Sequence, residues 1–211
     1  MSEESLRTNW DAYYNRPFKS ALIARKYTAQ VLINYIKKHV GKKDFTLTEI
    51  GGANSCFYEK IAEELKPHKY IIVDNNQLGL NKFRERLGNP QEVELYNQDI
   101  FAPDPTEHTD LVFSVGLIEH FDLKGTKEAI LNHLQYLKRP GTLILSFPTQ
   151  TLLYQITRKL AEISGLWLFP DERPLRLNEV EQTVTSFGRI VDKKILWPLF
   201  LTQYMIVVHV D

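Results

Sequence analysis

Residues 45–56, Phe-Thr-Leu-Thr-Glu-Ile-Gly-Gly-Ala-Asn-Ser-Cys, constrain the fold of this 211-residue chain more than any other stretch. Apolar residues alternate up to Ile50, Gly51 and Gly52 follow, and apolar residues at helical spacing begin at Phe57. This order predicts a strand, a tight turn and a helix. In an open α/β sheet such turns lie at the carboxyl ends of the strands, where ligands bind. Glycine lets the backbone turn sharply near a ligand, and the free N–H groups that open the next helix favour a polar or anionic group.

The turn fits a dinucleotide-binding fingerprint poorly. That fingerprint needs Gly-x-Gly-x-x-Gly, and counting from Gly51 the later glycine positions hold Ala53 and Cys56. The acid at the end of the strand, Glu49, is also unfavourable for a pyrophosphate, whereas a ligand with a cationic or hydroxyl-rich end would suit it. An NAD-dependent oxidoreductase is therefore the alternative rather than the main prediction, and no Tyr-x-x-x-Lys catalytic pair is recognisable.

Two further predicted strands end in an acid. Residues 69–74 form an apolar run that ends in Asp74, and residues 93–101 alternate and carry Asp99 near their end. A carboxylate at the end of the second strand can accept hydrogen bonds from two neighbouring ribose hydroxyls. The structural alternatives are a helix N-cap for Asp74 and the start of a loop for Asp99. Three successive strands that each close with an acid are the strongest pattern in the chain.

The stretch Glu49-Ile-Gly-Gly-Ala-Asn-Ser resembles motif I of the class I S-adenosylmethionine-dependent methyltransferases, Asp/Glu-x-Gly-x-Gly-x-Gly. Ala53 and Ser55 depart from that motif at two glycine positions. The resemblance implies that Asp74 binds the ribose of S-adenosyl-L-methionine, that Asp99 binds the adenine amine and that Ile100 packs on the purine. The other implied cofactor-binding residues in these turns are Glu49, Gly51, Asn54 and Asn75.

The predicted fourth strand, residues 109–116, leads into Leu-Ile-Glu-His-Phe, which also looks like the family pattern. In that resemblance Ser114 and Val115 line the methionine and sulfonium part of the cofactor, while Glu119 and His120 face the substrate. As the catalytic candidate, His120 could take a proton from an acceptor hydroxyl because a histidine pKa lies near neutrality; a structural histidine bonded to backbone is the alternative. Glu119 could orient His120 or, as in some relatives, assist a metal, and we expect no metal here.

Two segments are candidates to cover the predicted site, one over the cofactor and one over the acceptor pocket. Residues 1–40 form an N-terminal helical cap or lid, and their Trp-Asp-x-Tyr-Tyr string is similar to a family feature that places an aromatic residue over the methionine end of the cofactor. Tyr14 is the candidate, and a plain hydrophobic anchor is the alternative. Residues 149–178 are longer than a bare connection needs, and in the family such an insertion shapes the acceptor pocket. A packed helix, or a helix that contacts a membrane or a lipid-linked acceptor, are the other interpretations.

The remaining patterns complete one α/β domain over residues 1–211. Apolar spacing predicts further helices over 21–40, 57–65, 78–87, 126–138, 152–163 and 177–187, and strands over 143–147, 190–197 and 203–210. Gly141 is expected in the turn before the fifth strand, and Pro198 between the last two strands. The resemblance implies a three-layer, Rossmann-like, seven-stranded sheet that is mostly parallel with an antiparallel C-terminal strand.

Composition excludes several function classes. Lys+Arg and Asp+Glu are both 26, so the formal net charge is zero, which argues against a broad nucleic-acid-binding surface. The single cysteine, Cys56, permits neither an internal disulfide nor a cysteine zinc site, and we expect it packed on the first turn of a helix. Without a signal-peptide pattern or an apolar run of membrane length, the chain is expected to be soluble and cytoplasmic.

These observations predict an S-adenosylmethionine-dependent methyltransferase that acts on a small-molecule or saccharide-like acceptor. No dedicated covalent nucleophile is needed for such a reaction, which fits the absence of a recognisable catalytic triad. A non-catalytic Rossmann-like binding module is the third hypothesis, because Ala53 and Ser55 depart from motif I.

Overall fold

The computed structural model describes residues 7–15, 21–88, 93–197 and 201–211, without the side chains of 21–24. Within these ranges seven strands form one sheet in the order β3-β2-β1-β4-β5-β7-β6. Strands β1 to β5 pair in parallel, and β7 is antiparallel to both β5 and β6, so the predicted mostly parallel sheet with an antiparallel C-terminal strand is confirmed. The strands are β1 Thr46–Ile50, β2 Lys69–Asp74, β3 Val93–Asn97, β4 Thr109–Val115, β5 Leu137–Pro148, β6 Arg189–Leu196 and β7 Gln203–Val210.

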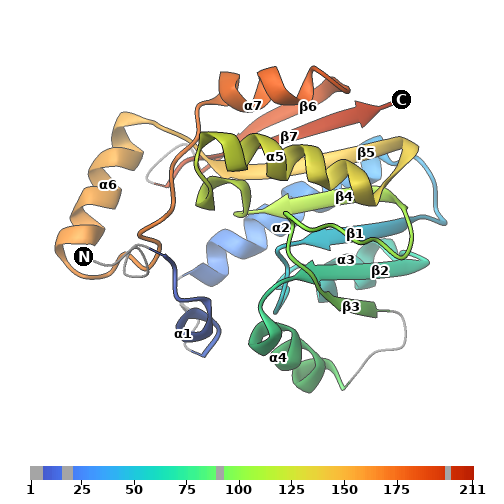
Figure 1. Ribbon diagram of the computed structural model, residues 1–211, viewed down its shortest axis with the longest axis horizontal. Coiled ribbons are helices and arrows are strands. Elements are labelled where there is room, and N and C mark those ends of the chain that lie inside the picture. Colours follow the sequence, from blue (N-terminus) through green and yellow to red (C-terminus); the bar gives the residue numbers. More distant parts are fainter. Residues whose placement is uncertain (1–6, 16–20, 89–92, 198–200) are drawn as a thin grey trace.

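Helices cover both faces of the sheet and give the three layers that were predicted (Figure 1). Helices α2 and α3 pack on one face, and α5 and α7 pack on the other. The helices are α1 Trp10–Asn15, α2 Ala21–His39, α3 Tyr58–Leu65, α4 Gln77–Leu87, α5 Leu123–His133, α6 Leu152–Ile163 and α7 Leu177–Val184.

The apolar character of β2 follows from burial on both faces. Tyr70 and Ile72 belong to the core on the side of α2 and α3, whereas Ile71 and Val73 belong to the core on the side of α5 and α7. Side chains alternate between the two faces of a strand, so a parallel strand covered on both faces is a continuous apolar run. The chain becomes polar again at Asp74, where the strand leaves the two cores.

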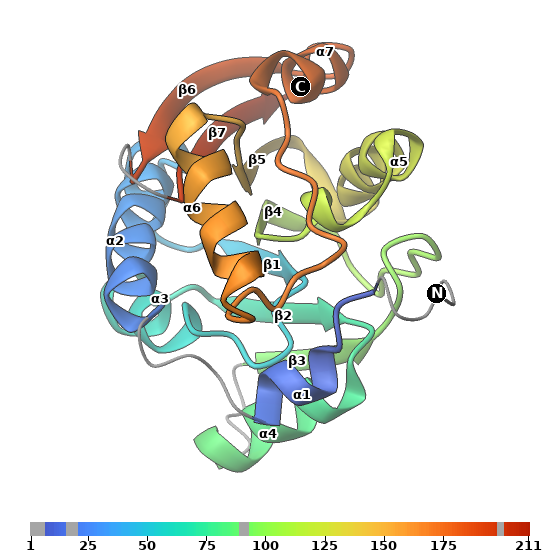
Figure 2. The same ribbon diagram turned by 90° about the vertical axis from the view of Figure 1, so that its left-hand side faces the viewer.

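Two helices lie outside the layers. Helices α1 and α6 lie beyond the carboxyl ends of β1, β2 and β4, and Figure 2 shows them in front of that edge of the sheet. Helix α1 of the predicted cap and α6 of the predicted insertion therefore lie at the edge of the sheet where the three strand-end acids lie, whereas α2, also within the predicted cap, packs on one face of the sheet. Among the described helices, none combines the length and apolarity needed to cross a bilayer.

The region before the fifth strand is irregular. Helix α5 ends at His133, a short 3-10 turn follows, and β5 is assigned from Leu137, earlier than predicted. Thr109 of β4 pairs with Leu137 and Leu111 pairs with Thr142, so residues 138–141 bulge out opposite one residue of β4. A Cβ atom at Gly141 would lie 2.4 Å from the carbonyl oxygen of Lys138, so the backbone folds back closely here and requires the glycine. The turn predicted at Gly141 is therefore present as a bulge within β5.

Smaller differences concern element ends. Strand β3 stops at Asn97, so Asp99 lies in the loop that follows it. Helix α3 begins at Tyr58, and Cys56 precedes the helix with an exposed side chain rather than packing on its first turn. The predicted interruption at Pro198 lies outside the described residues.

Candidate functional site

A cavity of about 1050 Å³ opens at the carboxyl ends of the parallel strands. It is bounded by the strand-end turns, by α1 and by side chains from residues 154–172. Eleven of the predicted site residues line it, namely Tyr14, Glu49, Gly51, Asn54, Asp74, Asn75, Asp99, Ile100, Val115, Glu119 and His120. Residues separated along most of the chain therefore meet in one place.

The turn after β1 is built around the carboxylate of Glu49. This side chain is only 3% exposed, and the hydroxyl of Tyr70 donates a 2.5 Å hydrogen bond to it. Burial raises the pKa of Glu49 to about 7, against the opposing effect of this bond. A Cβ atom on Gly52 would lie 2.5 Å from the Glu49 carboxyl carbon, so the second glycine makes room for this side chain. Gly51 has a φ of +75°, which favours glycine.

Ser55 explains one of the departures from motif I. Its hydroxyl accepts hydrogen bonds from the backbone N–H groups of Phe57 and Tyr58, at 3.1 and 3.2 Å. The expectation that free N–H groups at the start of this helix receive a ligand is therefore wrong for these two groups, because the serine already occupies them. Asn54 lines the cavity, and its side-chain oxygen accepts a 3.1 Å bond from Arg86 Nε.

Asp74 is not the N-cap of the following helix. That role belongs to Asn76, whose side chain accepts a hydrogen bond from Gly79 N. The two carboxylate oxygens of Asp74 accept from Ala53 N at 3.0 Å and from Asn76 N at 2.7 Å. These bonds fix the carboxylate between the turns after β1 and β2. Burial raises the pKa of Asp74 despite them.

The third acid is held in a similar way by groups of two turns. Asn75 Nδ2 donates a 3.2 Å hydrogen bond to Asp99, and Phe101 N donates a 2.9 Å bond to the other Asp99 oxygen. Ile100 is buried beside it and lines the cavity. An acid and an apolar face thus lie next to each other, as the recognition of a base edge and a base plane would need.

Ser114 is the one predicted site residue that does not line the cavity. It is fully buried, and its hydroxyl lies 2.9 Å from Nε2 of His133 on α5. Val115 follows it in β4 and does reach the cavity. Adjacent residues of a strand face opposite sides, so Ser114 contributes to the contact between the sheet and α5.

Aromatic side chains of α1 cover one side of the cavity. The ring of Tyr14 lies 5.3 Å from that of Tyr13 and 6.3 Å from that of Trp10. A Cβ atom on Gly79 would lie 2.9 Å from the Tyr14 ring, so α1 packs closely on α4. Burial, with nearby Asp74, raises the pKa of Tyr14 and keeps its hydroxyl protonated.

The turn after β4 carries Glu119 and His120. Glu119 is 2% exposed, and burial raises its pKa to about 8. Its Oε2 atom has no hydrogen-bond partner among the described residues. His120 Nδ1 lies 2.9 Å from Asp171 Oδ1. Burial acts to lower the pKa of His120, but the Asp171 bond and the nearby carboxylates outweigh it, so the net shift is upward.

The partners of His120 were missed in the sequence. Asp171 holds the imidazole and also accepts hydrogen bonds from the backbone N–H and the hydroxyl of Thr8, so the N-terminal segment and the insertion meet over the site. Burial acts against this, yet the His120 and Thr8 bonds lower the pKa of Asp171 to about 2. Glu172 also lines the cavity. The sequence Asp-Glu-Arg-Pro that contains Asp171 and Glu172 has no residue spacing by which a binding site could be told from a solvated loop.

Cys56 lines the cavity, and its thiol is accessible from the cavity while protein atoms displace much of the water around it. This desolvation raises its pKa to about 11. A reactive cysteine needs a lowered pKa, so the thiol is not an activated nucleophile.

Solved structures with the same architecture were found over nearly the whole chain. The N-methyltransferase NodS from Bradyrhizobium japonicum WM9, in complex with S-adenosyl-L-homocysteine, superposes with a TM-score of 0.74 at 14% identity, covering 99% of this chain and 97% of that one. Magnesium protoporphyrin IX methyltransferase ChlM from Synechocystis PCC 6803, with bound S-adenosyl-L-homocysteine, gives 0.70 at 15% identity, with 90% and 84% coverage. The chain has the class I S-adenosylmethionine-dependent methyltransferase fold.

A third structure with this fold, an S-adenosylmethionine-dependent methyltransferase from Clostridium acetobutylicum, has a TM-score of 0.66 at 16% identity and covers 90% of this chain and 95% of that one. No family model matches the sequence. A curated relative, malonyl-[acyl-carrier protein] O-methyltransferase 2 from Ilyobacter polytropus, is 25% identical over 101 residues. That match spans 48% of this chain and 38% of the relative's length.

Proposed function

We propose that this protein is an S-adenosylmethionine-dependent methyltransferase with a small-molecule acceptor, of which a saccharide-like compound is one candidate. The observation that carries the proposal is the convergence of Glu49, Asp74 and Asp99 on one cavity at the carboxyl ends of neighbouring strands. The NodS and ChlM structures with this fold hold S-adenosyl-L-homocysteine. The relative from Ilyobacter is a methyltransferase as well.

The cofactor would lie across the turns in the order of the strands. Asp99 would bind the adenine amine, with Asn75 holding the Asp99 carboxylate and Ile100 packing on the ring. Asp74 would bind the ribose hydroxyls, because its two bonds to backbone N–H groups fix its carboxylate and leave lone pairs available.

The methionine end would lie near the turn after β1 and under α1. Glu49 and Asn54 would bind its amino group, with Gly51 allowing close backbone approach and Val115 contacting the methyl-bearing sulfur. Tyr14 would cover this end from α1.

Methyl transfer needs alignment more than covalent assistance. An acceptor atom attacks the methyl carbon in line, the carbon–sulfur bond breaks, and the positive charge on sulfur disappears. Holding the two reactants in that geometry can supply roughly 7–11 kcal/mol. For a hydroxyl acceptor the proton must leave, and His120 Nε2 could take it while Asp171 stabilises the imidazolium through Nδ1. Glu119 lies on the same side of the cavity and would contact the acceptor.

Calorimetric titration of the protein with S-adenosylmethionine, and separately with NAD, tests the proposal. We expect saturable binding of the former alone. Asp74→Ala should weaken this binding by a factor of ten or more, because a hydrogen bond to a charged group contributes about 1.5–3 kcal/mol. Asp44→Ala, which changes an exposed carboxylate, is the matched control. Unchanged affinity in Asp74→Ala would contradict the ribose assignment, and binding of NAD instead would overturn the function.

A further inference from the structure

Three side chains with metal-ligating atoms meet on the side of the cavity formed by β4 and the loop after α6. Glu119, His120 and Glu172 each offer one ligand atom, and these atoms all lie within 4.8 Å of one another. The strand-end acids of β1, β2 and β3, which we assign to the cofactor, do not belong to this group.

Glu119 provides the most direct indication of a missing partner. Its side chain is buried, and Oε2 has no hydrogen-bond donor among the described residues. A buried carboxylate oxygen without a donor is costly. Each such oxygen in a native structure therefore calls for a ligand or another explanation.

His120 is held as a metal-ligating histidine usually is. Its Nδ1 atom lies 2.9 Å from Asp171 Oδ1, which leaves Nε2 as the ring nitrogen available to a cation. The ring also packs edge-to-face on Trp10, with a centroid distance of 4.9 Å. A carboxylate that binds the second ring nitrogen fixes the tautomer and orientation of a ligand histidine.

Glu172 is also held in place by hydrogen bonds. Tyr154 OH donates to its Oε1, and Arg158 donates a 2.6 Å bond to its backbone oxygen. The neighbouring Arg173 ties this loop to the other two ligands, because its backbone N–H donates a 2.8 Å bond to the carbonyl oxygen of Glu119.

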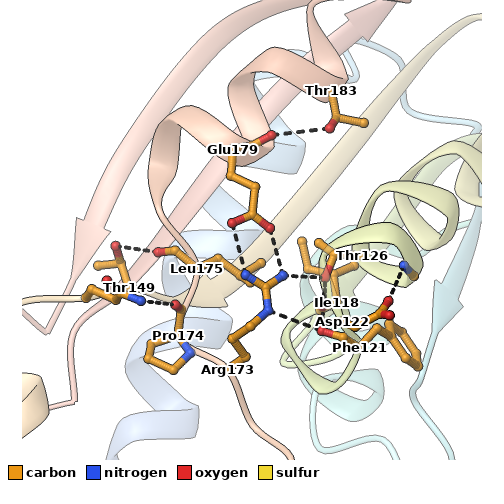
Figure 3. Close-up of polar contacts among 12 residues, drawn as sticks. Ile118, Phe121, Asp122, Thr126, Thr149, Arg173, Pro174, Leu175, Glu179 and Thr183 are labelled. Carbon is orange, nitrogen blue, oxygen red and sulfur yellow. Dashed lines mark hydrogen bonds and ion pairs between the residues drawn. The ribbon is translucent and has the colours of Figure 1, made fainter.

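The side chain of Arg173 strengthens that connection (Figure 3). It bonds to the carbonyl of Phe121, to the hydroxyl of Thr126 and, with two nitrogens, to Glu179. The two segments that carry the three ligand atoms are therefore joined by a rigid polar contact. A site that is held in this way needs little reorganisation to bind an ion.

Three carboxyl groups, on Glu119, Asp171 and Glu172, gather around one imidazole. The nearby guanidinium groups have other partners. Arg173 is paired with Glu179, and Arg158 bonds to Glu162 and to the Glu172 carbonyl and lies over the ring of Trp167. A divalent cation in the cluster would give the buried Oε2 atom of Glu119 a partner.

We infer that Glu119, His120 and Glu172 bind a divalent transition-metal ion such as Mn²⁺ or Zn²⁺. Imidazole nitrogen is a ligand for zinc and related ions and carboxylate oxygen is one for manganese, so a set with one nitrogen and two oxygens favours these over Ca²⁺ or Mg²⁺. Ligand atoms lie about 2.0–2.2 Å from such ions, and two on opposite sides are thus separated by about 4.2 Å. The ligand atoms of Glu119, His120 and Glu172 lie within 4.8 Å of one another, so only a small movement of these side chains toward one another is needed to bind an ion.

The cation would place an acceptor oxygen beside the cofactor, so the acceptor class would be a compound with oxygen donors. His120 would then be a ligand and not the proton acceptor described above. Metal binding is measured without S-adenosylmethionine, so this inference and the proposed function can fail separately.

The site is tested by titrating chelator-treated protein with MnCl₂. Binding is measured by calorimetry and by the electron paramagnetic resonance signal of free Mn²⁺. We expect one ion per chain and a rise of the melting temperature with Mn²⁺. Glu119→Gln and Glu172→Gln should each weaken binding by more than about tenfold. Glu162→Gln, at an exposed carboxylate of α6, is the matched control and should bind as the wild type does.

Circular dichroism shows whether each variant is folded, and its melting temperature with and without Mn²⁺ gives a second measure of binding. The inference is overturned if the wild type shows no saturable binding. It is also overturned if folded Glu119→Gln and Glu172→Gln proteins bind Mn²⁺ as the wild type does, which would locate the ion elsewhere.

Discussion

Arg173 offers a direct test of how the loop after α6 and the turn after β4 are held together. Arg173→Met removes every donor and keeps most of the apolar stem. The bond to the buried Thr126 is 2.9 Å, the bond to the Phe121 carbonyl is 3.3 Å, and the two bonds to Glu179 are 2.7 and 3.0 Å. The arginine side chain is 34% exposed, so solvent screening reduces each contribution.

We assign about 1 kcal/mol to the bidentate ion pair, the upper end for exposed pairs. The two bonds to Thr126 and Phe121 together contribute about 1–2 kcal/mol. Arg173→Met should therefore lower the free energy of unfolding by about 2–3 kcal/mol, whereas Glu179→Gln should cost about 1 kcal/mol or less.

Urea denaturation of the two single variants and the double variant measures these values and the coupling between the residues. The coupling should be close to 1 kcal/mol. Arg176→Met, at an exposed arginine of the same loop, should stay within about 0.5 kcal/mol of the wild type. The reasoning is refuted if Arg173→Met is as stable as this control, or if Glu179→Gln costs as much as Arg173→Met.

Three further predictions concern a cap, a buried histidine and the imidazole of the site. Asn76→Ala removes the acceptor for Gly79 N at the start of α4 and should cost about 1 kcal/mol in urea denaturation; no loss would contradict the capping role. Burial lowers the pKa of His133 to about 4 from its usual 6.5. Between pH 6.5 and pH 4 the unfolded chain therefore binds a proton at this histidine and the folded chain does not, so the free energy of unfolding falls by roughly 3 kcal/mol over that range. His133→Gln should reduce that acid slope, and an unchanged slope would disprove the assignment. Asp171→Asn removes the carboxylate beside His120, so the imidazole pKa followed by NMR should fall; a rise would be incompatible with the ion pair.

The fold was predictable because its signals are local. Strand β2 is an apolar run that ends in Asp74, Glu49 lies near the end of β1, and Asp99 follows β3 by two positions. Parallel strands bring these ends to one edge of the sheet. The part of the cavity that these strand-end turns line could therefore be assembled from sequence alone.

The part of the cavity around His120 and Asp171 could not be assembled in the same way. Asp171 reaches His120 across 51 positions of the chain, and no periodicity in its own segment marks that contact. Ser114 shows a different limit, because β4 is buried on both faces and polarity does not tell which of its residues reach the cavity. Tertiary packing decides both cases.

The contact between Thr8 and Asp171 joins positions that are 163 residues apart, and it depends on two hydrogen bonds at the cavity mouth. The entropy of closing so long a loop is recovered only once the sheet is already formed. This contact should consequently form late in folding and break early, through local opening with the sheet intact. Breaking it, together with the ring contacts of Trp10 and Tyr13 with Phe169, would free the N-terminal segment, whereas Arg173 keeps the loop after α6 tied to the turn after β4. Ligand entry and product exit would then share the side of the cavity that α1 covers, at far less cost than unfolding.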